Sequence, residues 1–154
     1  MKIEAKYPKV WLIRHGYSRF NQVKDANKLD PKIPYDKFSK DLIDAPLDEK
    51  GIDQCIQAQK EVNLKNIKIV FVSPLQRALE TSLHMFSKHP NLGKIKFIVQ
   101  PLLREVLNNA NDIPNHTLKR LREKYEKLEK FSYDFSSGVY TKNLYTYTLI
   151  PETF

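Results

Sequence analysis

The stretch VWLIRHGYSRFN, residues 10–21, decides the fold predicted for this chain. It opens with four apolar residues, too few for a helix, and this run ends abruptly at Arg14, His15 and Gly16. The pattern is typical of a buried strand that delivers polar side chains to the carboxyl edge of a sheet. Because glycine lets the backbone turn away at once, Arg14 and His15 can face one cavity while Asn21 returns over it. The alternative at this point is a strand that simply ends in solvated charge.

A second buried strand is predicted over residues 67–72, where the sequence is β-branched and almost uninterrupted. Ser73 follows it and suits the N-cap of a helix, while Pro74 suits the first helical position. Gln76 can complete a capping box there. The helix is predicted to end at about residue 86 or 87, because apolar residues recur at the helical period up to that point.

Arg77 lies in the first turn of this predicted helix. A cation gains nothing from the helix dipole at that end, which disfavours positive charge. Exposed backbone amides and an arginine together form an anion site. Arg77 is therefore predicted to serve a ligand rather than the helix.

Two further elements complete an alternation of strands and helices. A helix is predicted from Asp48, its N-cap, to about Val62, and a third strand is predicted over residues 94–100. Right-handed crossovers between such elements build a parallel sheet with helices on both faces. The predicted fold is therefore α/β, with three layers in the order α/β/α.

Charged side chains follow each predicted strand within a few residues. Ligands of a parallel α/β sheet bind at the carboxyl edge of its strands, so one cavity is predicted to collect these side chains. The residues concerned are Arg14, His15, Arg77 and Glu105.

Three stretches carry weaker signals. Residues 22–43 have no sustained period and predict a loop or insertion, with a short helix over residues 35–42 as one option. A helix is predicted over residues 114–130, with Asp112 or Asn115 as its cap.

The tail, residues 131–154, is aromatic and rich in threonine. It alternates only weakly, and residues 144–150 are its one candidate for an apolar strand. Its place in the fold stays open.

The composition fits one soluble domain over residues 1–154, with 41% hydrophobic and 29% charged residues. A net charge of +8 attracts anionic partners, which include phosphate esters, nucleic acid and acidic membranes. The densest basic cluster, within residues 119–130, is interleaved with glutamates at the i,i+4 spacing of a solvated helix face. Because no RNA-binding or DNA-binding motif accompanies it, a nucleic-acid module is disfavoured.

The sequence also indicates the cellular compartment in which the protein acts. Cys55 is the single cysteine, so no disulfide can form within the chain, and a reducing compartment fits. No apolar leader segment and no run long enough to span a membrane is present. We expect a cytoplasmic protein that does not enter a membrane.

Three segments together resemble the histidine phosphatase superfamily, the phosphoglycerate-mutase-like proteins. They are LIRHGYSRFN at residues 12–21, DAPLDEKG at residues 44–51 with the Gln-Ala pair at 57–58, and VSPLQRALET at residues 72–81. The segments occur in the order and at the spacing typical of the family, and the resemblance covers roughly residues 8 to 107.

The resemblance implies a role for each candidate residue. His15 would be the nucleophile that accepts a phosphoryl group, Arg14 and Arg77 would clamp the phosphate oxygens, and Asn21 would assist. Glu105 would be the general acid or base. The chemistry agrees, since a neutral imidazole can attack phosphorus while guanidiniums neutralise the charge on its oxygens. No metal or cofactor is implied, because the arginines take the place of a metal and no His/Cys cluster has ligand spacing.

One expected feature of the family is missing. Its members carry a second histidine late in the chain, usually in a strand that ends in His-Gly, and nothing in this sequence matches it. The remaining histidines are His84, His89 and His116, of which only His116 is a candidate stand-in. We expect an incomplete sheet at the C-terminal end.

Two hypotheses follow. The first is a phosphatase or phosphomutase that acts on a small phosphate ester through a phosphohistidine on His15. The second is a catalytically weak or inactive phosphate-binding member of the family, or a truncated fragment of one. The substrate, the choice between hydrolysis and transfer, and the oligomeric state stay open.

Overall fold

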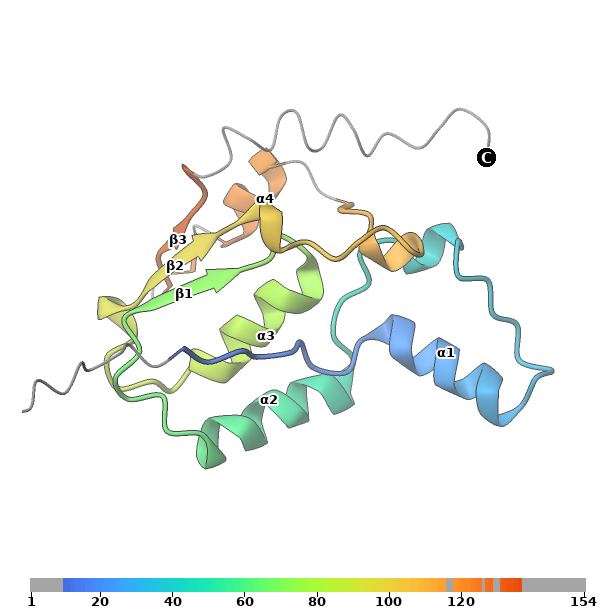
Figure 1. The fold of residues 1–154 in the computed structure, drawn as a ribbon, viewed down its shortest axis with the longest axis horizontal. Coiled ribbons are helices and arrows are strands. Elements are labelled where there is room, and N and C mark those ends of the chain that lie inside the picture. Colours follow the sequence, from blue (N-terminus) through green and yellow to red (C-terminus); the bar gives the residue numbers. More distant parts are fainter. Residues whose placement is uncertain (1–9, 116–117, 126, 129–130, 137–154) are drawn as a thin grey trace, which may run out of the picture.

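A parallel three-stranded sheet forms the centre of the molecule in the computed structural model (Figure 1). The structure describes residues 10–115, 118–125, 127–128 and 131–136. Its strands are β1 (Ile69–Val72), β2 (Lys96–Val99) and β3 (Tyr133–Asp134). Its α-helices are α1 (Arg19–Leu29), α2 (Glu49–Glu61), α3 (Gln76–Phe86) and α4 (Leu118–Tyr125). Single 3-10 turns are Lys40–Leu42, Leu92–Lys94, Pro101–Leu103 and Ala110–Asp112.

All described strand pairs are parallel, in the order β1-β2-β3. Val70 lies opposite Phe97, and Phe97 in turn lies opposite Tyr133. Because side chains alternate along a strand, these residues share one face of the sheet. That face packs against α3 and α4 in the main hydrophobic core, which includes Val72, Leu79, Met85, Phe86, Phe97, Val99, Leu121, Tyr125 and Tyr133. The predicted α/β class with a parallel sheet is confirmed.

The opposite face of the sheet differs from the prediction. In β1, Phe71 is 59% exposed and Ile69 is exposed as well, so the expectation of a strand buried on both faces is wrong for the residues described. The reason is that α3 and α4 contribute to the same core, on the face that carries Val72. Within the described part of the chain, β1 is also an edge strand, since only β2 pairs with it.

The predicted buried strand over residues 10–13 is not formed. These residues have no strand assignment, and all four are exposed, Leu12 to 95%. A cavity lies between this stretch and β1, and residues of both line it. An apolar run becomes a strand only where a neighbour offers backbone hydrogen bonds, and across this cavity none is formed.

Helix α1 lies where a loop or insertion was predicted for residues 22–43. It begins with a capping box, in which Ser18 Oγ accepts from the Asn21 backbone N–H and Asn21 Oδ1 accepts from the Ser18 N–H at 3.0 Å. Phe20 is its one fully buried residue, and Phe20 packs in a small cluster with Leu42 and Ala45. With so little burial the helix leaves no apolar period in the sequence, which is why it was missed.

Helix α2 confirms the prediction at its start, because Asp48 is the N-cap and its Oδ1 accepts from the Gly51 N–H at 2.9 Å. Helix α3 begins later than predicted, and the capping box of Ser73 with Gln76 is wrong. Asp44, from a distant loop, accepts the Gln76 N–H at 2.8 Å instead. A carboxylate supplied by tertiary contact thus takes the place of a local cap.

The last described elements differ from the prediction. Within the described residues, the helix predicted over residues 114–130 is formed as α4, Leu118–Tyr125, and β3 was not predicted. Of the two candidate caps for α4, Asp112 pairs with Arg77, and the Asn115 N–H donates to Asp44. Residues 144–150 lie outside the described residues. No helix within the described ranges is long and apolar enough to cross a membrane.

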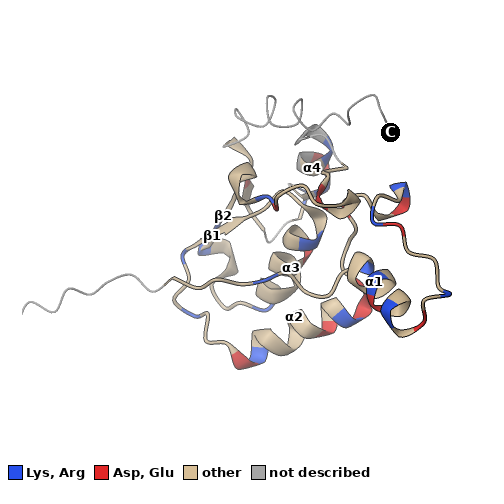
Figure 2. Ribbon diagram, turned by 45° about the vertical axis from the view of Figure 1, so that its right-hand side comes forward, with Lys and Arg blue, Asp and Glu red and all other residues tan. Residues whose placement is uncertain are grey.

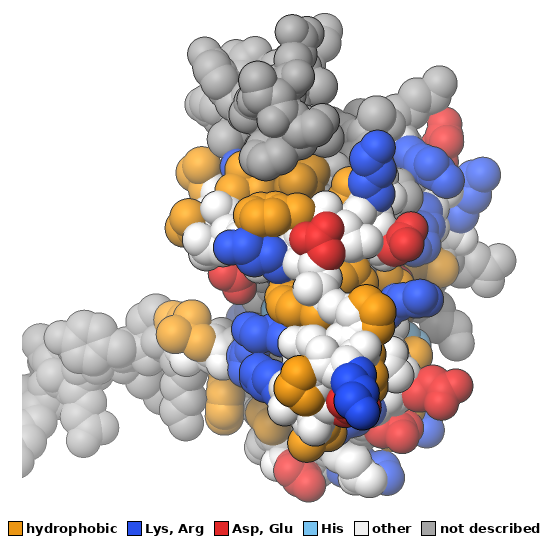
Figure 3. All heavy atoms as spheres, turned by 90° about the vertical axis from the view of Figure 1, so that its right-hand side faces the viewer, with side chains coloured by type: hydrophobic (Ala, Val, Ile, Leu, Met, Phe, Trp, Pro, Cys, Tyr) orange, Lys and Arg blue, Asp and Glu red, His pale blue; other side chains and the backbone are white. Residues whose placement is uncertain are grey.

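Charges of both signs are mixed along the described helices. Figure 2 shows both basic and acidic residues on α1, α2 and α4. The face that carries α1 shows basic and acidic side chains lying among hydrophobic ones (Figure 3). The net charge of +8 is therefore not gathered into one basic surface on this face.

Candidate active site

A cavity of about 920 Å³ lies between residues 10–15, the edge of β1 and α3, and residues from Leu75 to Phe86 line it along the helix. Most of its wall is apolar and includes Ile69 and Phe71 of β1. The polar side chains of its wall include four that the sequence predicted would meet at the carboxyl edge of the sheet, namely Arg14, His15, Arg77 and Glu105.

The imidazole of His15 is half-buried, and its Nδ1 lies 2.7 Å from the carbonyl oxygen of Gly16. A carbonyl oxygen can only accept, so Nδ1 carries the proton and Nε2 keeps a free lone pair in the neutral ring. Burial lowers the pKa of His15, and the positive charges of Arg77 and Arg14 lower it further. The hydrogen bond to Gly16 and the charge of Glu105 oppose this shift. At neutral pH the ring is therefore uncharged, with a lone pair on Nε2.

Close backbone packing fixes the residue after His15. The Gly16 N–H donates to Thr81 Oγ1 at 3.0 Å, and the Thr81 hydroxyl donates to the Arg77 carbonyl at 2.7 Å. A Cβ on Gly16 would lie 2.7 Å from the carbonyl oxygen of Gly51, and a Cβ on Gly51 would lie 2.0 Å from that of Tyr17. Two glycines therefore allow this stretch to cross the start of α2 and contact α3.

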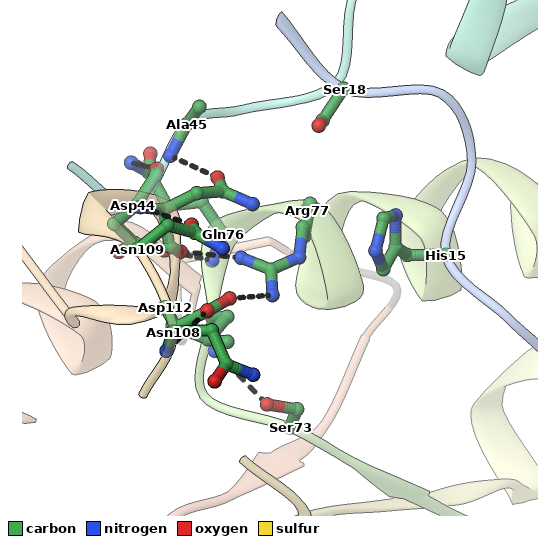
Figure 4. Close-up of polar contacts among 12 residues, drawn as sticks. His15, Ser18, Asp44, Ala45, Ser73, Gln76, Arg77, Asn108, Asn109 and Asp112 are labelled. Carbon is green, nitrogen blue, oxygen red and sulfur yellow. Dashed lines mark hydrogen bonds and ion pairs between the residues drawn. The ribbon is translucent and has the colours of Figure 1, made fainter. Parts of the chain in front are cut away.

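Arg77 is one of the most buried side chains of the molecule, with 2% exposure. Its Nη2 lies 3.1 Å from Asp112 Oδ1, and its Nη1 donates to the Asn111 carbonyl at 2.5 Å. Figure 4 shows the guanidinium between Asp112 on one side and His15 on the other. Asp112 was not predicted as a site residue, because no local pattern links it to an arginine 35 residues earlier.

The remaining predicted site residues take different positions. Arg14 and Glu105 are both exposed, and both act electrostatically on the pKa of His15. Asn21 does not line the cavity, and its side-chain oxygen accepts from Ser18 at the start of α1. The structure therefore brings four of the five predicted residues together and uses Asn21 as a helix cap.

His15 is the one histidine that lines the cavity among the described residues. His89 is held by other groups, with Nε2 2.9 Å from the Leu64 carbonyl and Nδ1 accepting from the Asn91 N–H. His84 lies in the last turn of α3, and His116 is outside the described residues. In the same described ranges, no three His, Cys, Asp or Glu side chains gather as they would around a metal ion.

The fold and the site define a class of protein, a parallel α/β protein with a histidine and arginines in a cavity at the end of its strands. A model of the histidine phosphatase superfamily (branch 1) matches residues 10–138, and the chain belongs to this superfamily. No individual curated protein gives a significant match. Membership supports a phosphatase-like or mutase-like function in general, on small phosphorylated substrates.

Proposed function

We propose that the chain transfers the phosphoryl group of a small phosphate ester to Nε2 of His15. In this step a P–N bond forms as the ester P–O bond breaks, and the leaving alkoxide takes a proton from Glu105. Water or a second alcohol then attacks phosphorus, the P–N bond breaks, and Glu105 accepts the proton of the attacking group. Water would make the protein a phosphatase, and an alcohol would make it a phosphomutase.

The observation that carries this proposal is the shared cavity of His15, Arg14, Arg77 and Glu105. The free lone pair on Nε2 supplies the nucleophile, and the lowered pKa of His15 keeps the ring neutral. The guanidiniums offer donors and positive charge to the equatorial oxygens of the phosphoryl group.

A second candidate function is phosphate binding with weak or no turnover. Among the described residues, the cavity contains no histidine besides His15 that could donate to the phosphoryl group in flight. Glu105 is exposed, which leaves its position over the cavity less constrained than that of a buried acid. Because a positioned proton donor contributes about 10²–10⁴-fold, the proposed enzyme should be slow.

The decisive variant is His15→Ala. We expect it to abolish both hydrolysis of para-nitrophenyl phosphate and acid-labile labelling by a radioactive phosphate donor, since no other histidine among the described residues lines the cavity. His84→Gln is the matched control, because it replaces a histidine of α3 that does not line the cavity. Retention of the label in His15→Ala would refute the proposal.

Calorimetry with inorganic phosphate and vanadate separates the two candidates. A chain that binds both anions through Arg14 and Arg77 but forms no label would be a binding protein. If Arg14→Ala leaves binding unchanged, both candidates lose their basis.

We also propose that residues 1–154 form one domain and that the chain acts in the cytoplasm. The family match runs through residues 10–138, and the main core joins residues from α3, all three strands and α4. A reducing compartment would suit Cys55, which is a buried free thiol.

A further inference from the structure

The ion pair of Arg77 with Asp112 lies in the interior of the molecule. The two side chains are 2% and 7% exposed, and Nη2 lies 3.1 Å from Oδ1. The Asn111 carbonyl accepts from Nη1 of the same guanidinium. Both terminal nitrogens of Arg77 therefore form hydrogen bonds to one short turn, Ala110–Asp112.

That turn is itself anchored to other parts of the fold. Asp112 Oδ2 accepts from the Asn108 N–H at 3.2 Å, so both carboxylate oxygens are occupied. The Ala110 N–H donates to the Lys37 carbonyl at 2.8 Å. Asn111 Oδ1 accepts from the Ala45 N–H at 3.0 Å. Because its support is rigid, Asp112 can hold the guanidinium in one orientation.

The two contacts to this turn use only two of the five N–H donors of Arg77. A guanidinium has five N–H groups in a fixed plane, and these two contacts use one on each terminal nitrogen. Among the described residues, Nε and one N–H on each terminal nitrogen have no hydrogen-bond partner. Figure 4 places Asp112 and His15 on opposite sides of the guanidinium, and Arg77 lines the cavity together with His15.

We propose that Asp112 is a positioning residue, which holds the guanidinium of Arg77 at the angle needed to bind a phosphoryl group beside His15. The proposal rests on the proposed function, in which Arg77 is a phosphate ligand. Asp112 does not touch the substrate and acts only through Arg77. The opposite role, a carboxylate that merely cancels the charge of Arg77 and weakens anion binding, makes the opposite prediction.

Two substitutions separate position from charge. Asp112→Asn removes the negative charge but keeps an oxygen that can accept from Nη2, whereas Asp112→Ala removes both. If Asp112 positions Arg77, Asp112→Ala should bind inorganic phosphate about tenfold or more weakly than Asp112→Asn, as expected for a lost hydrogen-bond contact to a charged group. Equal affinities, or tighter binding by Asp112→Ala, would overturn the proposal.

The same comparison in an Arg77→Met background tests whether the effect passes through Arg77. There the difference between Asp112→Asn and Asp112→Ala should disappear, and neither double variant buries an unpaired charge at this position. A difference of the same size in both backgrounds would show that Asp112 acts by another route. Thermal unfolding of all four proteins identifies any that fail to fold, and Asp112→Val, which also removes both the charge and the acceptor, then replaces Asp112→Ala.

A measurement without phosphate keeps this inference separate from the proposed function. Titration of the His15 ring by NMR reports how close the positive charge of Arg77 lies. Both substitutions remove the same charge, so only the position of Arg77 distinguishes them. We expect a higher pKa of His15 in Asp112→Ala than in Asp112→Asn, and identical pKa values would overturn the positioning role. If no variant binds phosphate but the two pKa values differ, the proposed function fails and the positioning role stands.

Discussion

In the proposed reaction, His15 attacks phosphorus only while its ring carries a single proton. Burial and the nearby arginines lower its pKa from the ordinary value of 6.5, so the neutral form persists into more acidic solution. The midpoint of the fall in labelling rate with decreasing pH should therefore lie below pH 6.5. Arg14→Gln should move this fall to higher pH, because it removes a positive charge near the ring. The pH profile of the labelling rate gives the midpoint for the unmodified chain and for Arg14→Gln. A midpoint above pH 6.5 in the unmodified chain would contradict the expectation.

Asp44 links the pH of the solution to stability. Its backbone has a φ of 48°, and burial raises the pKa of its carboxyl from 3.8 to about 6, although the N–H groups of Gln76 and Asn115 and the charge of Arg77 oppose the shift. The folded state therefore binds a proton more tightly than the unfolded state. The resulting stabilisation is complete below pH 3.8 and is lost as the pH rises to about 6, with a size on the order of 3 kcal/mol.

Asp44→Asn isolates this contribution. Asparagine tolerates the left-handed backbone and cannot titrate, so the loss of stability between pH 4 and 6 should be smaller in the variant. Chemical unfolding at a series of pH values gives the free energy of unfolding against pH for the unmodified chain and for Asp44→Asn. If they run parallel across this range, the carboxyl of Asp44 does not carry the shift.

At the scale of elements, the contact between α2 and the stretch after His15 depends on Gly51. Gly51→Ala places a Cβ 2.0 Å from the Tyr17 carbonyl oxygen, a backbone atom that cannot move without moving the stretch. We expect a loss of about 1–3 kcal/mol in the free energy of unfolding, together with weaker phosphate binding, because His15 moves with Tyr17. Gly93→Ala is the matched control, since a Cβ there meets nothing within 4 Å. Chemical unfolding and calorimetry test both variants, and a Gly51→Ala protein as stable as Gly93→Ala would contradict the packing described.

At the scale of the whole molecule, the apolar wall of the cavity and the uncovered face of β1 form one exposed apolar surface. Phe71 is 59% exposed and lines the cavity together with Leu12 and Ile69, which are exposed as well. Surfaces of this kind bind hydrophobic probes and promote association. Phe71→Thr should therefore reduce the binding of the neutral dye Nile red while changing the free energy of unfolding by less than about 0.5 kcal/mol.

Phe97→Ala is the contrasting variant for this prediction. Phe97 is fully buried between the sheet and its helices, so its truncation should cost about 3–5 kcal/mol and should not reduce dye binding. Fluorescence titration and chemical unfolding distinguish the two cases. Unchanged dye binding in Phe71→Thr would show that the dye does not bind to this surface.

The sequence alone determined the local features of this protein. The periodicity of α2, its cap at Asp48, the parallel arrangement of β1 and β2, and the meeting of His15, Arg77 and Glu105 at one sheet edge were all predicted. Such features depend on neighbours in the chain or on the general rule that parallel strands share a carboxyl edge.

Only the tertiary structure decided which groups meet across long distances in the chain. It assigned Asp44 to the start of α3 and Asp112 to Arg77. It also left residues 10–13 exposed, since an apolar stretch is buried only where another surface covers it. A hydrogen bond or an ion pair between distant residues leaves no period in the sequence, and burial depends on the whole arrangement of the chain. For these reasons the sequence predicted that His15 and Arg77 would share one cavity, and the fold alone showed which groups hold Arg77 there.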